Sequence, residues 1–82
     1  MTKQEIVAVI VRIIREVIPD LQDYDIQLDD QLVNLGANSV DRVEIVIMAM
    51  EELGLKIPRV QLSVAKNIGE LVEVFYENQQ VA

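Results

Sequence analysis

The centre of the chain reads LGANSVDRVEIVIMAMEEL over residues 35–53, a glycine-containing bend followed by a long apolar-rich stretch. A helix that begins near Asn38 or Ser39 and ends at Gly54 would give this stretch two apolar faces. The first face consists of Ile45, Val46, Ala49 and Leu53, and the second of Val40, Val43, Ile47 and Met50. A helix that is apolar on most of its circumference is normally buried on all sides, which a three-helix domain of 82 residues cannot arrange. We therefore expect the first face in the core, and either part of the second face exposed for a partner or the preceding loop folded over it.

The residues before this helix predict another helix and a long loop. Thr2 and Glu5 have the spacing of a capping box, so we expect a helix from Lys3, and its apolar periodicity stops at Pro19. Residues 20–38 contain five aspartates together with scattered apolar side chains. That pattern predicts an ordered loop pinned to the core by its apolar residues, which are Leu21, Ile26, Leu28, Leu32 and Leu35.

The residues after the central helix predict two more helices. Pro58 opens a short segment of about one helical turn through Val64, and Asn67 and Glu70 repeat the capping spacing at the start of a final helix. The inward face of that helix is formed by Ile68, Leu71, Val72 and Phe75. The sequence thus predicts one all-α domain over residues 1–82, with three main helices, a short minor helix and a long first loop.

The composition excludes several classes of function. The chain has no His and no Cys, so the usual bases, nucleophiles and transition-metal ligands are missing, and we expect no catalytic residue, no metal site and no enzymatic activity. Seven basic and fourteen acidic residues give a net charge of −7, which repels phosphate backbones and anionic lipid, so we expect neither a nucleic-acid nor a membrane partner. The longest apolar runs have six residues, whereas a bilayer span needs about 20, and the N-terminus has no secretory pattern. We expect a soluble, cytoplasmic monomer.

The aspartates of residues 20–30 raise the possibility of calcium. An EF-hand loop needs glycine at its sixth position and a carboxylate at its twelfth. A loop counted from Asp23 places Leu28 and Asn34 at these positions, and one counted from Asp25 places Asp30 and Gly36 there. Neither register fits, so the aspartates are interpreted as a solvated acidic loop.

Ser39 stands at the start of the central helix. A serine in this place is commonly a helix cap, and without a histidine to activate it a protease-like nucleophile is excluded. The alternative is a serine that another enzyme modifies, because an attached phosphate would be favoured by the positive end of the helix dipole. Arg42 follows one turn later and has no acidic residue three or four positions away. It is either an ordinary solvated residue or free to reach such a phosphate or a partner's acidic group.

The segment LGANSVDRVEIV at residues 35–46 resembles the phosphopantetheine attachment motif of acyl carrier proteins, commonly Leu-Gly-Ala-Asp-Ser-Leu-Asp before a Val-Glu-Leu-Val-like helix. The resemblance continues through residues 51–52 and 57–58 into the last helix. It implies that Ser39 carries 4′-phosphopantetheine, installed from coenzyme A by a phosphopantetheinyl transferase, and that the thiol of this arm holds acyl groups as thioesters. It also implies a partner-binding surface on the central helix, formed by Val40, Asp41, Arg42, Val43, Glu44, Ile47 and Glu51. Partners of such carriers commonly offer basic patches, toward which the net negative charge would steer the chain.

Two residues depart from the common motif, because Asn38 replaces an aspartate and Arg42 a small polar residue. With these departures the segment is similar to the freestanding donor carriers of polyketide β-branching. The resemblance then implies that the chain delivers acetyl to an HMG-CoA-synthase-like enzyme, after loading by a ketosynthase-like decarboxylase or another acyl-loading enzyme. Asn38 leaves open which transferase acts. The alternatives are a carrier of fatty-acid synthesis, against which Asn38 and Arg42 count, and an unmodified helical adaptor in which Ser39 is only a cap.

Overall fold

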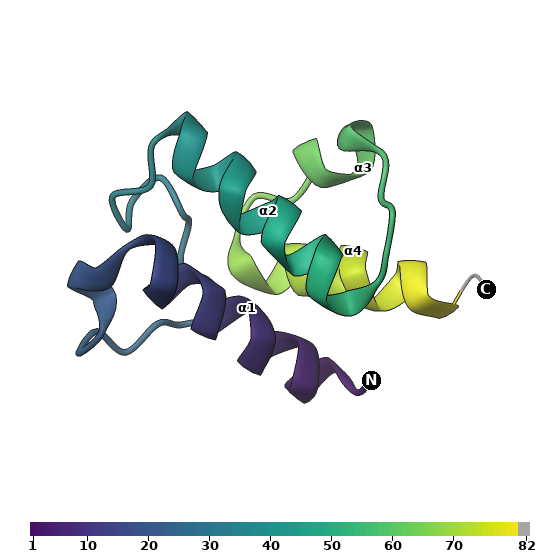
Figure 1. Ribbon diagram of the computed structural model, residues 1–82, viewed down its shortest axis with the longest axis horizontal. Helices are drawn as coiled ribbons and strands as arrows, with labels where there is room; N and C mark the ends of the chain where they lie inside the picture. Colours follow the sequence, from purple (N-terminus) through teal and green to yellow (C-terminus); the bar gives the residue numbers. More distant parts are fainter. Residues whose placement is uncertain (81–82) are drawn as a thin grey trace.

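The computed structural model describes residues 1–80 of the chain and contains only helices, turns and loops in that range. The elements are α1 (Lys3–Val17), the 3₁₀ turn η1 (Pro19–Leu21), α2 (Ser39–Leu53), α3 (Arg59–Ser63) and α4 (Ile68–Gln80). Figure 1 shows the three long helices α1, α2 and α4 packed together, with the short α3 beside α4, and the start of α1 and the end of α4 at the same end of the molecule. The all-α prediction of three main helices, a minor helix and a long first loop is confirmed; the 3₁₀ turn was not predicted.

The helix ends follow their capping signals. Thr2 forms a capping box with Glu5, in which the threonine hydroxyl accepts a hydrogen bond from the Glu5 backbone N–H at 3.1 Å and the Glu5 carboxylate accepts one from the Thr2 N–H at 2.8 Å. Gly54 ends α2 in the left-handed conformation, with φ of 66°, where a side chain would be strained. Local sequence therefore determines where α1 begins and where α2 ends.

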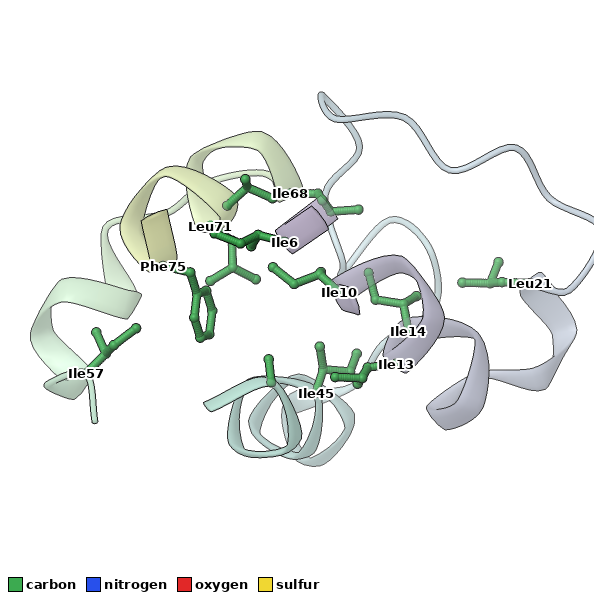
Figure 2. Packing of buried hydrophobic residues seen from close by; sticks show 12 residues of the cluster. Ile6, Ile10, Ile13, Ile14, Leu21, Ile45, Ile57, Ile68, Leu71 and Phe75 are labelled. Atoms are coloured by element: carbon green, nitrogen blue, oxygen red, sulfur yellow. The ribbon is translucent and has the colours of Figure 1, made fainter. Parts of the chain in front are cut away.

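Helix α1 is the centre of the core. It packs against both α2 and α4, whereas α2 and α4 make no close backbone approach among the described residues. The isoleucines on its inner face are almost completely buried, and Figure 2 shows them pointing toward Ile45 of α2 and Phe75 of α4. These isoleucines are Ile6, Ile10, Ile13 and Ile14. The predicted inward face of α4 is confirmed, since Ile68, Leu71, Val72 and Phe75 are all buried.

The two apolar faces of α2 have different surroundings. On the first face Ile45 and Ala49 are buried, whereas Val46 and Leu53, which were predicted to be core residues as well, pack against the core but are only partly buried. The reason is that α2 meets the rest of the bundle mainly along α1, so only a narrow strip of the helix is enclosed. On the second face, three of the four residues are exposed and Met50 is partly buried; the exposed residues are Val40, Val43 and Ile47.

The long loop follows α1 and α4 and does not cover the second face of α2. Leu21 is buried, while Ile26, Leu32 and Leu35 pack against the core; Leu28 is half exposed, which corrects its prediction as an anchor. Leu28 is held through its backbone instead, because its carbonyl oxygen accepts a hydrogen bond from the Gly69 N–H at 2.7 Å. A Cβ atom at position 69 would lie 3.2 Å from that oxygen, so glycine permits the close approach. Because Val40, Val43 and Ile47 remain exposed, the alternative in which the loop folds over this face of α2 is overturned.

Within the described part of the chain, no helix is both long and apolar enough to cross a membrane.

Candidate functional site

Ser39 is the first residue of α2 and is exposed. The N-cap is the preceding residue: the Asn38 side-chain oxygen accepts a hydrogen bond from the Asp41 N–H at 2.8 Å, and the Asp41 carboxylate accepts one from the Asn38 N–H at 3.2 Å. The interpretation of Ser39 as a cap is therefore wrong. Asn38 performs that task and leaves the serine hydroxyl outside the capping box, at the positive end of a 15-residue helix.

The backbone of the bend before Ser39 is held in place by its two preceding residues, Gly36 and Ala37. Gly36 adopts a φ of 96°, which favours glycine, and Ala37 is buried with its N–H donating to the Leu32 carbonyl at 3.0 Å. The loop and the start of α2 are thereby joined to the core immediately before an exposed hydroxyl. This arrangement fixes the path of the backbone into the exposed Ser39.

An open cavity of about 540 Å³ begins at Ser39 and extends between α2, α3 and the start of α4. It exists because the backbones of α2 and α3 do not pack against each other among the described residues. Its apolar lining includes the exposed side chains of Val33, Val43 and Ile47 and several partly or fully buried ones, among them Val46, Met50, Ile57, Leu62, Ala65 and Leu71. The cavity therefore offers apolar surface directly beside the exposed serine.

Three cations also line this cavity: Arg42 on α2, Arg59 at the start of α3 and Lys66 before α4. No acidic residue is among the described lining residues. The ion pairs of the described residues lie elsewhere and join Lys3 to Glu73 at 2.7 Å, and Arg12 to Glu16 and Glu52. Arg42 forms no ion pair within residues 1–79.

The predicted partner-binding residues lie along one side of α2, from the helix start to its last turn. Asp41 and Arg42 are half-buried, and the other five are exposed. These five are Val40, Val43, Glu44, Ile47 and Glu51. Sequence reasoning missed the wall of the cavity that faces α2, including Arg59 and Lys66. Their positions in the sequence contain no signal of this, because only the fold brings residues 42, 59 and 66 around one cavity.

The described residues contain no group of three or more acidic side chains that could hold a metal ion, the aspartates of the long loop included.

The family described as Phosphopantetheine attachment site matches residues 8–75, most of the chain. The chain belongs to this family of acyl carrier domains. Its cofactor is 4′-phosphopantetheine, whose thiol supplies the thioester chemistry when the group is attached. The residues present fit that group, since an exposed hydroxyl at a helix start adjoins a cavity with an apolar lining and cationic side chains.

Two further comparisons connect the carrier with polyketide biosynthesis. It is 54% identical to the polyketide biosynthesis acyl-carrier-protein AcpK of Bacillus subtilis (strain 168), over the full length of both chains. It is also similar to a chain in the crystal structure of the curacin biosynthetic pathway HMG synthase in complex with an acetyl-donor ACP, with 45% identity and a TM-score of 0.86. This match covers 92% of the carrier and 96% of that chain, which is therefore of nearly the same length. Both relatives favour the polyketide carrier over the fatty-acid carrier and the helical adaptor.

Proposed function

We propose that this carrier holds an acetyl group as a thioester on a phosphopantetheine arm at Ser39 and donates it to an HMG-CoA-synthase-like enzyme during polyketide β-branching. The observation that carries the proposal is the similarity of nearly the whole chain to a chain of the HMG synthase and acetyl-donor ACP complex. The presence of Asn38 and Arg42 in the attachment segment supports the same assignment.

Attachment at Ser39 is supported by its exposure at the helix start, outside the capping box. A transferase would join the serine oxygen to the phosphorus of the pantetheine phosphate of coenzyme A, with loss of the hydroxyl proton and departure of adenosine 3′,5′-bisphosphate. The new phosphodiester is favoured by the helix dipole. Arg42, one turn further along α2, would lie beside it.

Docking of the synthase is proposed on α2, at Val40, Arg42, Val43 and Ile47. Exposed apolar side chains beside the attachment serine provide surface that a partner can bury. Glu44 and Glu51 are exposed as well, and their charges would mainly accelerate encounter with a basic patch. A phosphopantetheinyl transferase and a ketosynthase-like decarboxylase, or another acyl-loading enzyme, complete the proposed set of partners, and residues 1–82 are proposed to form one carrier domain.

Attachment is tested by treating the apo-carrier with coenzyme A and a broad-specificity transferase and measuring its intact mass. We expect one phosphopantetheine on the wild type and none on Ser39→Ala. Ser63→Ala is the matched control, because Ser63 is the only other serine and its hydroxyl donates to the Val60 carbonyl at 2.8 Å. A phosphopantetheine adduct on Ser39→Ala would refute the assignment.

The donor role is tested by acetyl transfer from the loaded carrier to a purified HMG-type synthase at sub-saturating carrier. Arg42→Ala removes a charge-assisted contact, and we expect roughly ten- to hundredfold weaker binding. Glu44→Ala should change mainly the salt dependence of the rate. If the wild type donates no better than a generic fatty-acid carrier, the β-branching role is wrong, whereas unchanged transfer by Arg42→Ala would make that arginine an ordinary solvated residue.

A further inference from the structure

The cavity beside Ser39 has a local charge opposite to that of the whole chain. The sequence has fourteen acidic and seven basic residues, yet three cations and no described acidic residue line the cavity. The ion pairs within residues 1–79 use only Lys3 and Arg12, so Arg42, Arg59 and Lys66 are not compensated by them. Arg42 is half-buried, whereas Arg59 and Lys66 are exposed. Their uncompensated positive charge favours an anionic ligand, with an attraction that salt screens.

A phosphodiester at Ser39 accounts for only one of the three cations. Arg42 is on the same helix and one turn away, so it is the cation placed for that phosphate. Arg59 begins α3 and Lys66 precedes α4, so both belong to parts of the cavity outside α2. Glu70 accepts a hydrogen bond from the Lys66 backbone N–H at 2.9 Å but forms no ion pair with the Lys66 ammonium. Arg59 and Lys66 thus remain for a second negative group.

The rest of the cavity lining indicates which kind of stem would carry that negative group. Between the cations lie mainly apolar side chains, including Val46, Met50 and Leu62, which suit methylene groups. A ligand with an apolar stem and an anionic end matches both features. An arm attached to Ser39 would place its acyl group next to this cavity, since Ser39 itself lines it.

We infer that the cavity binds acyl groups that end in a carboxylate, held on this chain's own phosphopantetheine arm. The inference rests on the proposed attachment at Ser39. Guanidinium and ammonium groups pair well with a carboxylate, Arg59 through two parallel N–H donors and Lys66 as a point charge. An acetyl group has neither a terminal charge nor a long stem, so it gains little from the cavity and stays available for transfer. The cavity would therefore retain carboxylate-ended cargo and leave acetyl free.

The test compares two acyl groups that differ only at their end. The carrier is loaded with amide-linked butyryl or succinyl pantetheine analogues, which resist hydrolysis, and loading at Ser39 is checked by intact mass. We expect the succinyl form to have a Tm about 2–5 °C above that of the butyryl form, a difference that shrinks in about 1 M salt. The backbone amide NMR signals of residues 57–67 should also differ between the two forms.

The double variant Arg59→Gln/Lys66→Met should lose this difference in Tm and in NMR shifts. Lys56→Met is the matched control and should keep it, because Lys56 does not line the cavity but an adjoining hollow beside Gly54 and Pro58. Equal behaviour of the two loaded forms, or a difference that survives in the double variant, would overturn the inference. No synthase takes part, so a carrier that donates acetyl but fails here loses only the cavity assignment, and one that passes here but donates poorly loses only the donor role. A carrier that cannot be loaded at Ser39 loses both.

Discussion

Helix α1 and the α2–α3 side of the molecule use the same kinds of residue for different purposes. The isoleucines of α1 are buried, and all its cations have partners: Lys3 and Arg12 in ion pairs, and Arg15 with the Leu21 and Tyr24 carbonyl oxygens. On the α2–α3 side, valines at positions 40 and 60 are about 70% exposed (70% and 72%), and the cavity cations form no ion pair among the described residues. The side chains of α1 are thus satisfied within the bundle, whereas the exposed valines and the cavity cations on the α2–α3 side have no such partners among the described residues.

The sharpest way to break this comparison uses two isoleucines of the same helix. Ile45 is 0% exposed and Ile47 is 44% exposed, although only one residue separates them on α2. Ile45→Ala should lower the free energy of unfolding by about 2–5 kcal/mol, since it leaves a cavity against α1. Ile47→Ala should cost less than about 1 kcal/mol and should weaken synthase binding instead. Urea denaturation measures both, and equal costs would show that the faces of α2 are wrongly assigned.

A second prediction concerns the stability that the Asn38 cap contributes at the start of α2. Asn38→Ala removes the side chain that caps the helix and should cost about 1 kcal/mol of unfolding free energy. Asn38→Asp should keep the stability, because aspartate is an equally good N-cap, and it restores the charge found in the common carrier motif. Denaturation and the rate of transferase modification are measured together. An Asn38→Ala variant as stable as the wild type would mean that another group, Ser39 included, can cap the helix.

A smaller effect on stability is expected when an ion-paired arginine, Arg12, is compared with one that forms no ion pair, Arg42. Arg12→Met breaks the contacts with Glu16 and Glu52, of which the second joins α1 to α2, so it should lower the Tm slightly. Arg42→Met breaks no ion pair of the described residues and should leave the Tm unchanged. Calorimetry of the two variants in low salt compares them directly. A larger loss for Arg42→Met would show that Arg42 serves the fold rather than a ligand.

The smallest expected effect concerns pH and the first turn of α1. The hydrogen bond that the Thr2 backbone N–H donates to the Glu5 carboxylate is the main cause that holds the pKa of Glu5 below its ordinary value of 4.5, and the nearby Thr2 side chain adds to this lowering. A lowered folded-state pKa gives stabilisation that is present above the ordinary pKa and is lost as the pH falls through the lowered value. Glu5→Gln should therefore show a slightly weaker fall of Tm between about pH 5 and pH 3 than the wild type. An identical pH profile would mean that the capping box contributes nothing measurable.

The helix boundaries could be predicted from sequence because their signals are local. A capping residue, a proline or a glycine affects hydrogen bonds within one turn, so Thr2, Pro19, Gly54 and Pro58 placed the ends of α1, α2 and α3 without knowledge of the rest of the chain. The predictions that were wrong depended on distant neighbours. Leu28 is held by its carbonyl oxygen against Gly69 and not by its side chain, and no pattern within the loop indicates this.

The sequence was thus enough to predict the all-α architecture, the negative charge, the missing catalytic side chains and an attachment segment whose family the comparisons confirm. The exposed face of α2 and the cavity beside Ser39 could be known only once the fold was known. The choice between Asn38 and Ser39 as the cap is local, but both are good N-cap residues, so the sequence left it open. The reason is the distance along the chain over which each interaction acts. Periodicity and capping act over a few residues, whereas exposure and local charge depend on where α1, α3 and α4 come to lie. Arg42, Arg59 and Lys66 line one cavity because the bundle leaves α2 and α3 apart.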